Sequence, residues 1–232
     1  MRILACVLVV PMLVVVWQWW LDTSTERRLT PVASAIAGRD VHVDCQTYWG
    51  ALIDPLPRHG EVIFDRNGIP EDRLFLTHET CRKLASFAGS EDHSELACLP
   101  ETRWSPETGG PFADPCYATA SDTIYAVLTL AHEAYHTAGV RNEAHANCFA
   151  TQAMAFAATS LGAPDEEGRA LATAMALLLP FQTDAYRTTD CVSGSSLDLN
   201  PETPSFPTED LISAPSGKGG IPGLAAGAAV PA

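Results

Sequence analysis

The stretch HEAYHTAGVRNEAHANCFA, residues 132–150, decides how we interpret the fold. His132 and His136 are four residues apart, so on a helix they lie about 40° apart on one face, with Glu133 about 60° beyond His136. In this HExxH spacing two neutral imidazoles bind Zn²⁺, and the glutamate acts on a water molecule held by the ion. The stretch therefore predicts a helix that carries a hydrolytic zinc site.

Three successive helices are predicted around this motif, over about residues 122–138, 141–161 and 165–179, because glycine and proline residues separate them where helices end. Ser121 is the expected N-cap of the first helix. Small apolar residues lie opposite the histidines on that helix at helical spacing, namely Val127, Ala131, Ala134 and Ala138. We expect this face to pack and the face of the histidines to stay polar.

A catalytic zinc site needs a third protein ligand, and three residues just after the motif are candidates. Asn142 stands where the HExxHxxGxxH pattern of metzincins has its third histidine, but a neutral amide is a poor zinc ligand. His145 is two residues from Glu143 and so lies on nearly the opposite side of the second helix. Glu143 also has an ordinary role, because acidic residues in the first turn of a helix interact favourably with its dipole.

Residues 143–150, EAHANCFA, fit the pattern ExxANxFA. An HExxH helix followed by this segment on the next helix resembles the minimal gluzincins of the ImmA/IrrE type. The resemblance implies a zincin-like helical core in which His132, His136 and Glu143 bind Zn²⁺ and Glu133 is the general base. The link between the two motifs is short here, but connections between antiparallel helices have such lengths.

Such a site also requires a donor that stabilises the oxyanion of the transition state. Four residues are candidates, each with an ordinary structural role as the alternative, namely Tyr135, His145, His78 and Tyr186. We assign no role to the scattered histidines His42, His59 and His93.

Short strand-forming runs precede the helices. EVIFD, residues 61–65, and RLFLT, residues 73–77, flank an Asn-Gly turn signal and predict a small antiparallel hairpin. By analogy with zincins, RLFLT presents an edge to an extended peptide. Thr77 is expected to cap a helix that ends near Gly89. The expected fold class is α+β and mostly helical, with a zincin-like helical core and a small antiparallel sheet.

Six cysteines follow residue 40 and include no CxxC pair, namely Cys45, Cys81, Cys98, Cys116, Cys148 and Cys191. They indicate three disulfides in an oxidising compartment, the alternative being reduced, buried cysteines in a cytosolic domain. The sequence does not choose the pairing. A bond within the Pro- and Gly-rich loop 90–120 would tie that loop down. A Cys148–Cys191 bond would fasten the second helix to the C-terminal segment, whereas Cys148 as a fourth zinc ligand would make the site structural.

Residues 3–21, ILACVLVVPMLVVVWQWWL, carry no charge, and at about 1.5 Å per residue the run matches a bilayer core of about 30 Å. Three tryptophans gather at its C-terminal end, as is typical of the headgroup region. We predict a membrane anchor over residues 1–21, so that the chain is preceded by one transmembrane helix. A cleaved signal peptide is the alternative.

Composition divides the rest of the chain. Residues 22–40 are interpreted as a linker, residues 41–191 as one disulfide-containing domain, and residues 192–232, rich in Pro, Gly, Ser and Ala, as a disordered tail. The formal net charge is −14, from 28 acidic and 14 basic residues, and no Lys/Arg cluster stands out. Because a phosphate backbone requires local positive charge, we expect no nucleic-acid partner.

These features predict a single-pass membrane protein whose extracytoplasmic domain uses Zn²⁺ to hydrolyse a peptide or protein substrate. If the N-terminal segment is cleaved, the same domain is secreted. The alternative is a non-catalytic, exported and disulfide-stabilised binding or scaffold domain with structural zinc or none. The sequence indicates neither the substrate specificity nor the oligomeric state.

Overall fold

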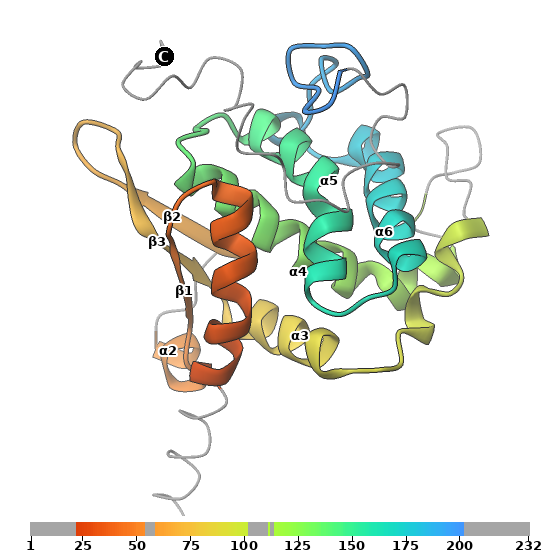
Figure 1. Ribbon diagram of the computed structural model, residues 1–232, viewed down its shortest axis with the longest axis horizontal. Coiled ribbons are helices and arrows are strands. Elements are labelled where there is room, and N and C mark those ends of the chain that lie inside the picture. Colours follow the sequence, from red (N-terminus) through yellow and green to blue (C-terminus); the bar gives the residue numbers. More distant parts are fainter. Residues whose placement is uncertain (1–21, 54–58, 102–110, 112–113, 202–232) are drawn as a thin grey trace, which may run out of the picture.

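The computed structural model describes residues 22–53, 59–101, 111 and 114–201. Three long helices form its core (Figure 1), namely α4 (Pro115–Thr137), α5 (Glu143–Ser160) and α6 (Asp165–Leu178). A small sheet lies on one side of them, made of β1 (His42–Cys45), β2 (Gly60–Phe64) and β3 (Pro70–Leu76). The described part of the chain is therefore a mostly helical α+β fold, as predicted.

The sheet is mixed rather than purely antiparallel, which corrects the prediction. Its strand order is β1-β3-β2, with β2 antiparallel and β1 parallel to β3. The hairpin of β2 and β3 is confirmed, but β1 joins on its other side, with Val43 opposite Leu74 and both side chains buried. The RLFLT run belongs to β3, so it lies in the centre of the sheet and has no edge to offer. The edges are β1 and β2.

Residues 22–37 are helical and pack on the domain, whereas the sequence led us to expect a linker over 22–40. The apolar residues of this helix recur every three or four positions and are almost fully buried, namely Leu29, Val32, Ala33 and Ile36. Polar residues lie between these apolar positions, so the helical period is not evident from the composition. Three of the polar residues hold β1, namely Glu26, Thr30 and Ser34.

Three side chains of this helix cover the outer edge of β1. Ser34 Oγ accepts a hydrogen bond from the backbone N–H of Val41, Thr30 Oγ1 from Val43, and Glu26 Oε1 from Cys45, at 3.0 to 3.2 Å. Four residues of helix rise about 6.0 Å and two residues of strand about 6.6 Å, so the two spacings match. With β1 covered in this way, β2 is the edge strand whose outer side pairs with no other strand among the described residues.

The remaining elements are short, apart from α3 (His78–Gly89), whose predicted cap Thr77 accepts a hydrogen bond from the Thr80 N–H. They are α2 (Tyr48–Ile53) and the 3-10 turns Ser94–Leu96, Leu99–Glu101, Leu179–Phe181 and Asp184–Tyr186. Helix α4 begins seven residues earlier than the predicted 122, because Asp114 rather than Ser121 caps it and Pro115 follows in the first turn.

Helix α4 is buried on all sides over its second half, including the face that we expected to stay polar. It contacts α3, α5, β2 and β3, so most of its surface there is covered by other elements. His132, Glu133 and His136 are only 6 to 7% exposed. Their polar groups are therefore enclosed in the domain rather than displayed on a surface helix.

Three disulfides are present, as predicted, and they join Cys45 to Cys81, Cys98 to Cys116, and Cys148 to Cys191. The first links β1 to α3, the second ties the loop after α3 to the start of α4, and the third fastens α5 to the segment after α6. A fourth-ligand role for Cys148 is excluded, because its sulfur is bonded to Cys191.

Residues 192–201 were predicted to belong to a disordered tail, but they pack on the domain. Residues 192–201 contain no helix or strand, but Leu197 is buried and the Gln152 side chain of α5 bonds the Leu197 carbonyl and the Leu199 N–H, both at 2.8 Å. Residues 202–232 and the predicted anchor, residues 1–21, lie outside the described residues. Within the part that is described, no helix is both long and apolar enough to cross a membrane.

Candidate metal centre

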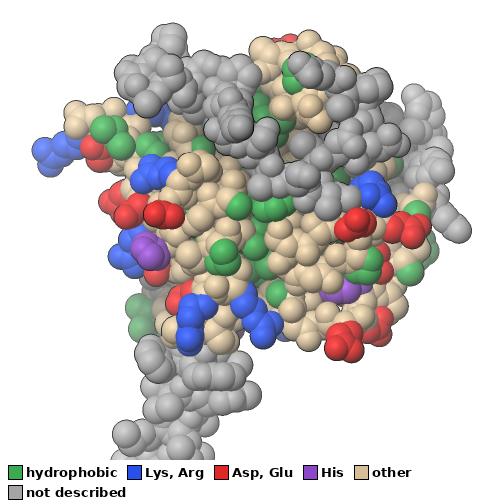
Figure 2. Space-filling view, in the orientation of Figure 1, with side chains coloured by type: hydrophobic (Ala, Val, Ile, Leu, Met, Phe, Trp, Pro, Cys, Tyr) green, Lys and Arg blue, Asp and Glu red, His purple; other side chains and the backbone are tan. Residues whose placement is uncertain are grey.

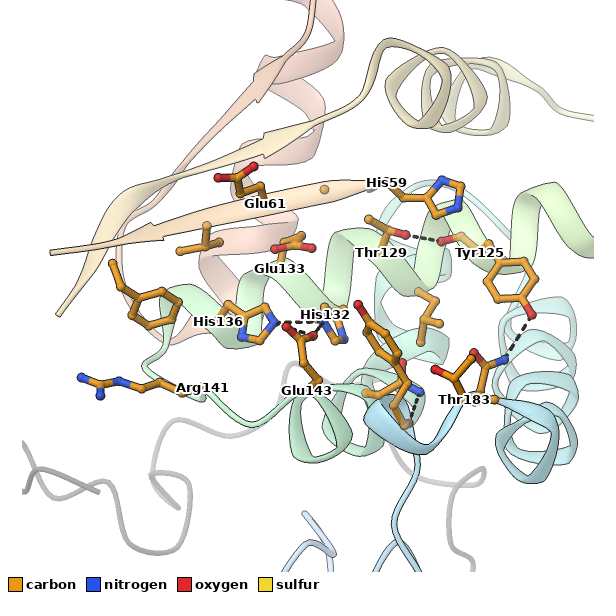
Figure 3. Close-up of a pocket in the computed structure, with 17 residues that line it drawn as sticks. His59, Glu61, Tyr125, Thr129, His132, Glu133, His136, Arg141, Glu143 and Thr183 are labelled. Atoms are coloured by element: carbon orange, nitrogen blue, oxygen red, sulfur yellow. Dashed lines mark hydrogen bonds and ion pairs between the residues drawn. The ribbon is translucent and has the colours of Figure 1, made fainter. Parts of the chain in front are cut away.

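Three side chains from two helices converge on one point (Figure 3). Nε2 of His132 lies 3.0 Å from Nε2 of His136 and 3.0 Å from Oε2 of Glu143, and His136 Nε2 lies 3.3 Å from the same oxygen. In the described part of the chain, these residues form the only group of three that could hold a metal ion. The sequence predicted this set, and the structure brings it together.

The distances fit a small tetrahedral ion. Ligand atoms about 2.0 to 2.1 Å from Zn²⁺ at tetrahedral angles are about 3.3 Å apart, close to the separations found here. The His132 and His136 side chains are only 9% and 8% exposed, and Glu143 is 33% exposed. Two buried imidazole nitrogens and a carboxylate oxygen that face one another need a cation or a proton between them.

The α4–α5 connection brings Glu143 to the histidines. Gly139 has φ of +99°, a conformation that favours glycine, and its N–H bonds the His136 carbonyl at 2.9 Å, while the Val140 N–H bonds the Tyr135 carbonyl at 3.1 Å. Asn142 then caps α5, since its side chain accepts a hydrogen bond from the His145 N–H. Asn142 is thus a cap rather than a ligand, and Glu143 is the first residue of the new helix.

The same connection orients one imidazole. Nδ1 of His136 lies 2.5 Å from the Val140 carbonyl oxygen, which only accepts, so Nδ1 carries the hydrogen and donates. In the neutral ring, Nε2 then has its lone pair directed at His132 and Glu143. Metal-binding histidines have this arrangement, because the second nitrogen fixes the tautomer and the ring direction.

Each of the three groups has a shifted pKa. Hydrogen bonds from His132 and His136 hold the pKa of Glu143 far below its usual range. Burial lowers the pKa of His132, and the hydrogen bond with Glu143 opposes this only in part. For His136 burial also acts to lower the pKa, but the Glu143 hydrogen bond, the charge of Glu133 and the Val140 carbonyl together raise it. The raised pKa of His136 and the lowered pKa of Glu143 both favour a protonated imidazole beside an ionised carboxylate.

Glu133 lies beside this group, between the histidines and β2 (Figure 3). It is 6% exposed, and it lines a cavity of about 560 Å³ together with the three ligand candidates. Gly60 of β2 packs directly on its side chain. The predicted general base is therefore next to the predicted metal ligands and at the wall of a cavity that holds room for a substrate.

The cavity has further polar residues that sequence patterns did not single out, namely His59, Tyr125, Thr129, Gln182 and Thr183. They come from the start of β2, the middle of α4 and the segment after α6. Each stands alone in the sequence, without a motif or spacing that relates it to HExxH. Only the fold places them together.

Of the four candidate oxyanion donors, only Tyr186 lines the cavity, with its ring centre 5.9 Å from that of His132. Tyr135 is 2% exposed and packs against Phe149 in the core, where burial raises its pKa. His78 contacts Tyr48 of α2, and neither His78 nor His145 lines the cavity.

Two residues of the EAHANCFA segment hold Tyr186 in place. Nδ2 of Asn147 donates a 2.8 Å hydrogen bond to the Tyr186 carbonyl, and the Cys148–Cys191 disulfide fastens the chain five residues beyond Tyr186. The segment EAHANCFA therefore supplies the ligand candidate Glu143 and, through Asn147 and Cys148, holds Tyr186 in the cavity wall.

Comparisons with known protein families, with curated proteins and with solved structures find no match for this chain. The likeness to zincins therefore rests on the two motifs and on the geometry of His132, His136, Glu143 and Glu133.

Proposed function

We propose that the chain is a zinc-dependent peptidase of gluzincin type, anchored in a membrane with its catalytic domain in an oxidising compartment. The observation that carries the proposal is the convergence of His132, His136 and Glu143, within 3.0 to 3.3 Å, beside the buried Glu133. The three disulfides support the oxidising compartment, and the uncharged run 3–21 supports the anchor.

Two nitrogens and one carboxylate oxygen are a ligand set that zinc uses in catalytic sites, where three protein ligands leave one position open. When bound, Zn²⁺ supplies a Lewis acid and lowers the pKa of water toward 7. Histidine and glutamate also bind other divalent metals, so the metal has to be identified by analysis.

Glu133, Tyr186 and His136 have separate roles in the proposed reaction. Glu133 is placed to take a proton from water and return it to the leaving amine, because it lies in the cavity wall next to the histidines. The Tyr186 hydroxyl is the candidate donor to the oxyanion, because Tyr186 lines the cavity with its ring close to that of His132. His136 keeps its ring direction through Val140 throughout.

An extended peptide fits the open edge of β2. The Thr77 N–H donates to the His59 carbonyl at 3.0 Å where the β2–β3 ladder begins. Backbone groups of alternate residues point to opposite edges of a strand, so those of His59 and Glu61 face β3 and those of Gly60 and Val62 face the free edge. Gly60 and Val62 both line the cavity, so a peptide strand added there would pass Glu133.

The test uses the purified full chain, metal analysis and a peptide library. The wild type should hold about one zinc per chain and cleave peptides. Glu133→Gln should keep the zinc and lose about 10²- to 10⁴-fold in activity. Glu61→Gln is the matched control on β2, an exposed glutamate that lines the same cavity, and it should stay close to wild type.

Metal binding is tested separately with His132→Ala/His136→Ala, which should lose the zinc, and with His145→Ala, which should keep it. Full zinc content in the double variant would show that the metal is held elsewhere. Zinc bound in the wild type without cleavage of any peptide would instead favour the non-catalytic binding or scaffold domain.

A further inference from the structure

The short helix α2 exposes an unusual amount of apolar surface. Tyr48 is 45% exposed, Trp49 60%, Leu52 60% and Ile53 84%, and no residue of α2 is buried. A small group of hydrophobic side-chain atoms is visible in this region, at the left edge of the view (Figure 2). Large aromatic and aliphatic side chains that lie together in water usually mark a surface that binds a partner.

The position of α2 indicates which partner. Glu26, near the start of helical residues 22–37, bonds the Cys45 N–H at the end of β1, and α2 begins three residues later. Figure 1 shows α2 beside the start of this helix. The uncharged run 3–21 leads directly into residue 22, so α2 lies next to the point where the predicted anchor joins the domain.

We propose that α2 docks on the surface of a zwitterionic phospholipid bilayer, with Trp49, Leu52 and Ile53 inserted at the boundary between headgroups and acyl chains. The proposal rests on the anchor in the proposed function, and it adds a second contact that fixes the orientation of the domain. Tryptophan and tyrosine favour the headgroup region, because their rings are apolar with one polar group.

The charges near α2 favour a neutral lipid surface. Helix α2, YWGALI, has no charged residue, and residues 22–28 carry two acidic and two basic side chains, namely Asp22, Glu26, Arg27 and Arg28. The chain as a whole has a net charge of −14, which would be repelled by an anionic surface. Burial of apolar side chains, rather than attraction of charge, therefore drives the contact.

The sheet provides a built-in control position. Strands β1 and β3 end, and β2 begins, at the α2 end of the sheet, so the turn between β2 and β3 lies at the other end. Strands of five to seven residues span about 17 to 23 Å, whereas a headgroup layer is only about 5 to 8 Å thick. Ile69 in that turn is 60% exposed, like Trp49, but lies beyond the reach of the headgroups.

The experiment measures tryptophan quenching by brominated lipid in the full chain. Trp17, Trp19, Trp20 and Trp104 are replaced by Phe, which leaves Trp49, and the protein is reconstituted in phosphatidylcholine vesicles with or without bromine on the upper acyl chain. A second variant adds Trp49→Phe and Ile69→Trp. We expect brominated lipid to cause a large loss of emission in the first variant and little or none in the second. Adding Leu52→Ser/Ile53→Ser to the first variant should reduce the loss.

Flotation of the vesicles separates the two hypotheses. Protein that floats with the vesicles while Trp49 is unquenched would overturn the docking of α2 and leave the anchor intact. Equal quenching in the Ile69→Trp variant would also overturn it, since the contact would then not be specific to α2. Protein that does not float with the vesicles would overturn both the anchor and the docking of α2. Peptide cleavage is measured without vesicles, so the peptidase proposal is tested independently of both.

Discussion

Gly60 of β2 lies so close to Glu133 of α4 that a Cβ atom on residue 60 would be 2.6 Å from Cγ of Glu133. Real Cβ atoms do not approach other carbon atoms so closely, so one of the two would have to move. The edge strand and the candidate base are therefore fitted to each other, and the same glycine lines the cavity in which the proposed reaction occurs.

Gly60→Ala should displace the Glu133 carboxylate while the three ligands stay in place. Because a misplacement of about 1 Å costs on the order of 10²-fold in rate, we expect kcat to fall by about that factor with unchanged zinc content. Gly89→Ala is the control, because a Cβ there meets only Arg28 Nη1 at an ordinary 3.8 Å. Full activity of Gly60→Ala would show that Glu133 does not need its present position.

Tyr186→Phe should lower kcat by about 10²-fold and leave KM and zinc content nearly unchanged, since only a transition-state contact is removed. Steady-state kinetics on one peptide substrate measure both constants. Tyr125→Phe is the control within the same cavity, where the hydroxyl accepts a 3.1 Å hydrogen bond from Gln182. If Tyr186→Phe raises KM alone, the hydroxyl binds the ground state and another group meets the oxyanion.

The local parts of the candidate site could be predicted from sequence because they depend on helix geometry. HExxH places His132 and His136 on one face whatever packs around them. Glu143 was predicted through the resemblance of EAHANCFA to the second gluzincin motif, and the short turn at Gly139 brings it to the histidines. The cap at Thr77 and the hairpin of β2 and β3 could be predicted for the same reason. Each depends on residues close together in the chain.

The rest depends on contacts between distant segments, which a single sequence does not display. The parallel pairing of β1 with β3 joins residues about 31 apart, such as Val43 and Leu74. The cavity brings His59 and Thr183 together across most of the domain. Residues 22–37 were misjudged because the polar side chains Glu26, Thr30 and Ser34, which hold β1, interrupt the apolar period.

Asn142→Ala should weaken zinc binding without removing a ligand. Loss of this cap costs on the order of 1 kcal/mol, and it frays the turn that carries Glu143. We expect the apparent zinc affinity to fall about 5- to 10-fold, measured by competition with a chelator, and Asn142→Ser to restore most of it. A larger loss in both variants would instead indicate that the amide contacts the metal.

Removal of the Cys148–Cys191 disulfide should affect both stability and function. Cysteines 43 residues apart contribute about 4 kcal/mol in the chain-entropy model, so Cys148→Ala/Cys191→Ala should lower Tm by about 10 °C. The control is Cys45→Ala/Cys81→Ala, with a separation of 36 and a similar expected loss. At temperatures below the unfolding transitions of both variants, only Cys148→Ala/Cys191→Ala should have a lower kcat, because it loosens the segment that carries Tyr186. Equal activity in both would mean that Asn147 alone holds Tyr186.

In the metal-free protein, His132, His136 and Glu143 together should stabilise the fold most near pH 6.5. The raised pKa of His136 contributes stability that is present below about 6.5 and is lost as pH rises through the raised value. The lowered pKa values of His132 and Glu143 act in the other direction, since their contributions are lost as pH falls, below about 6.5 for His132 and below about 4.5 for Glu143.

Thermal unfolding of the metal-free chain between pH 5 and 9 measures this dependence, and we expect changes of a few degrees on either side of the maximum. In Glu143→Gln the decline above about pH 6.5 should become smaller, because the pKa of His136 is then raised only by the charge of Glu133 and by the Val140 carbonyl. With zinc present, stability should rise rather than fall over the same range, because the ion competes with protons for the imidazoles. A metal-free wild type whose Tm does not fall above pH 6.5 would mean that the pKa of His136 is not raised in the folded protein.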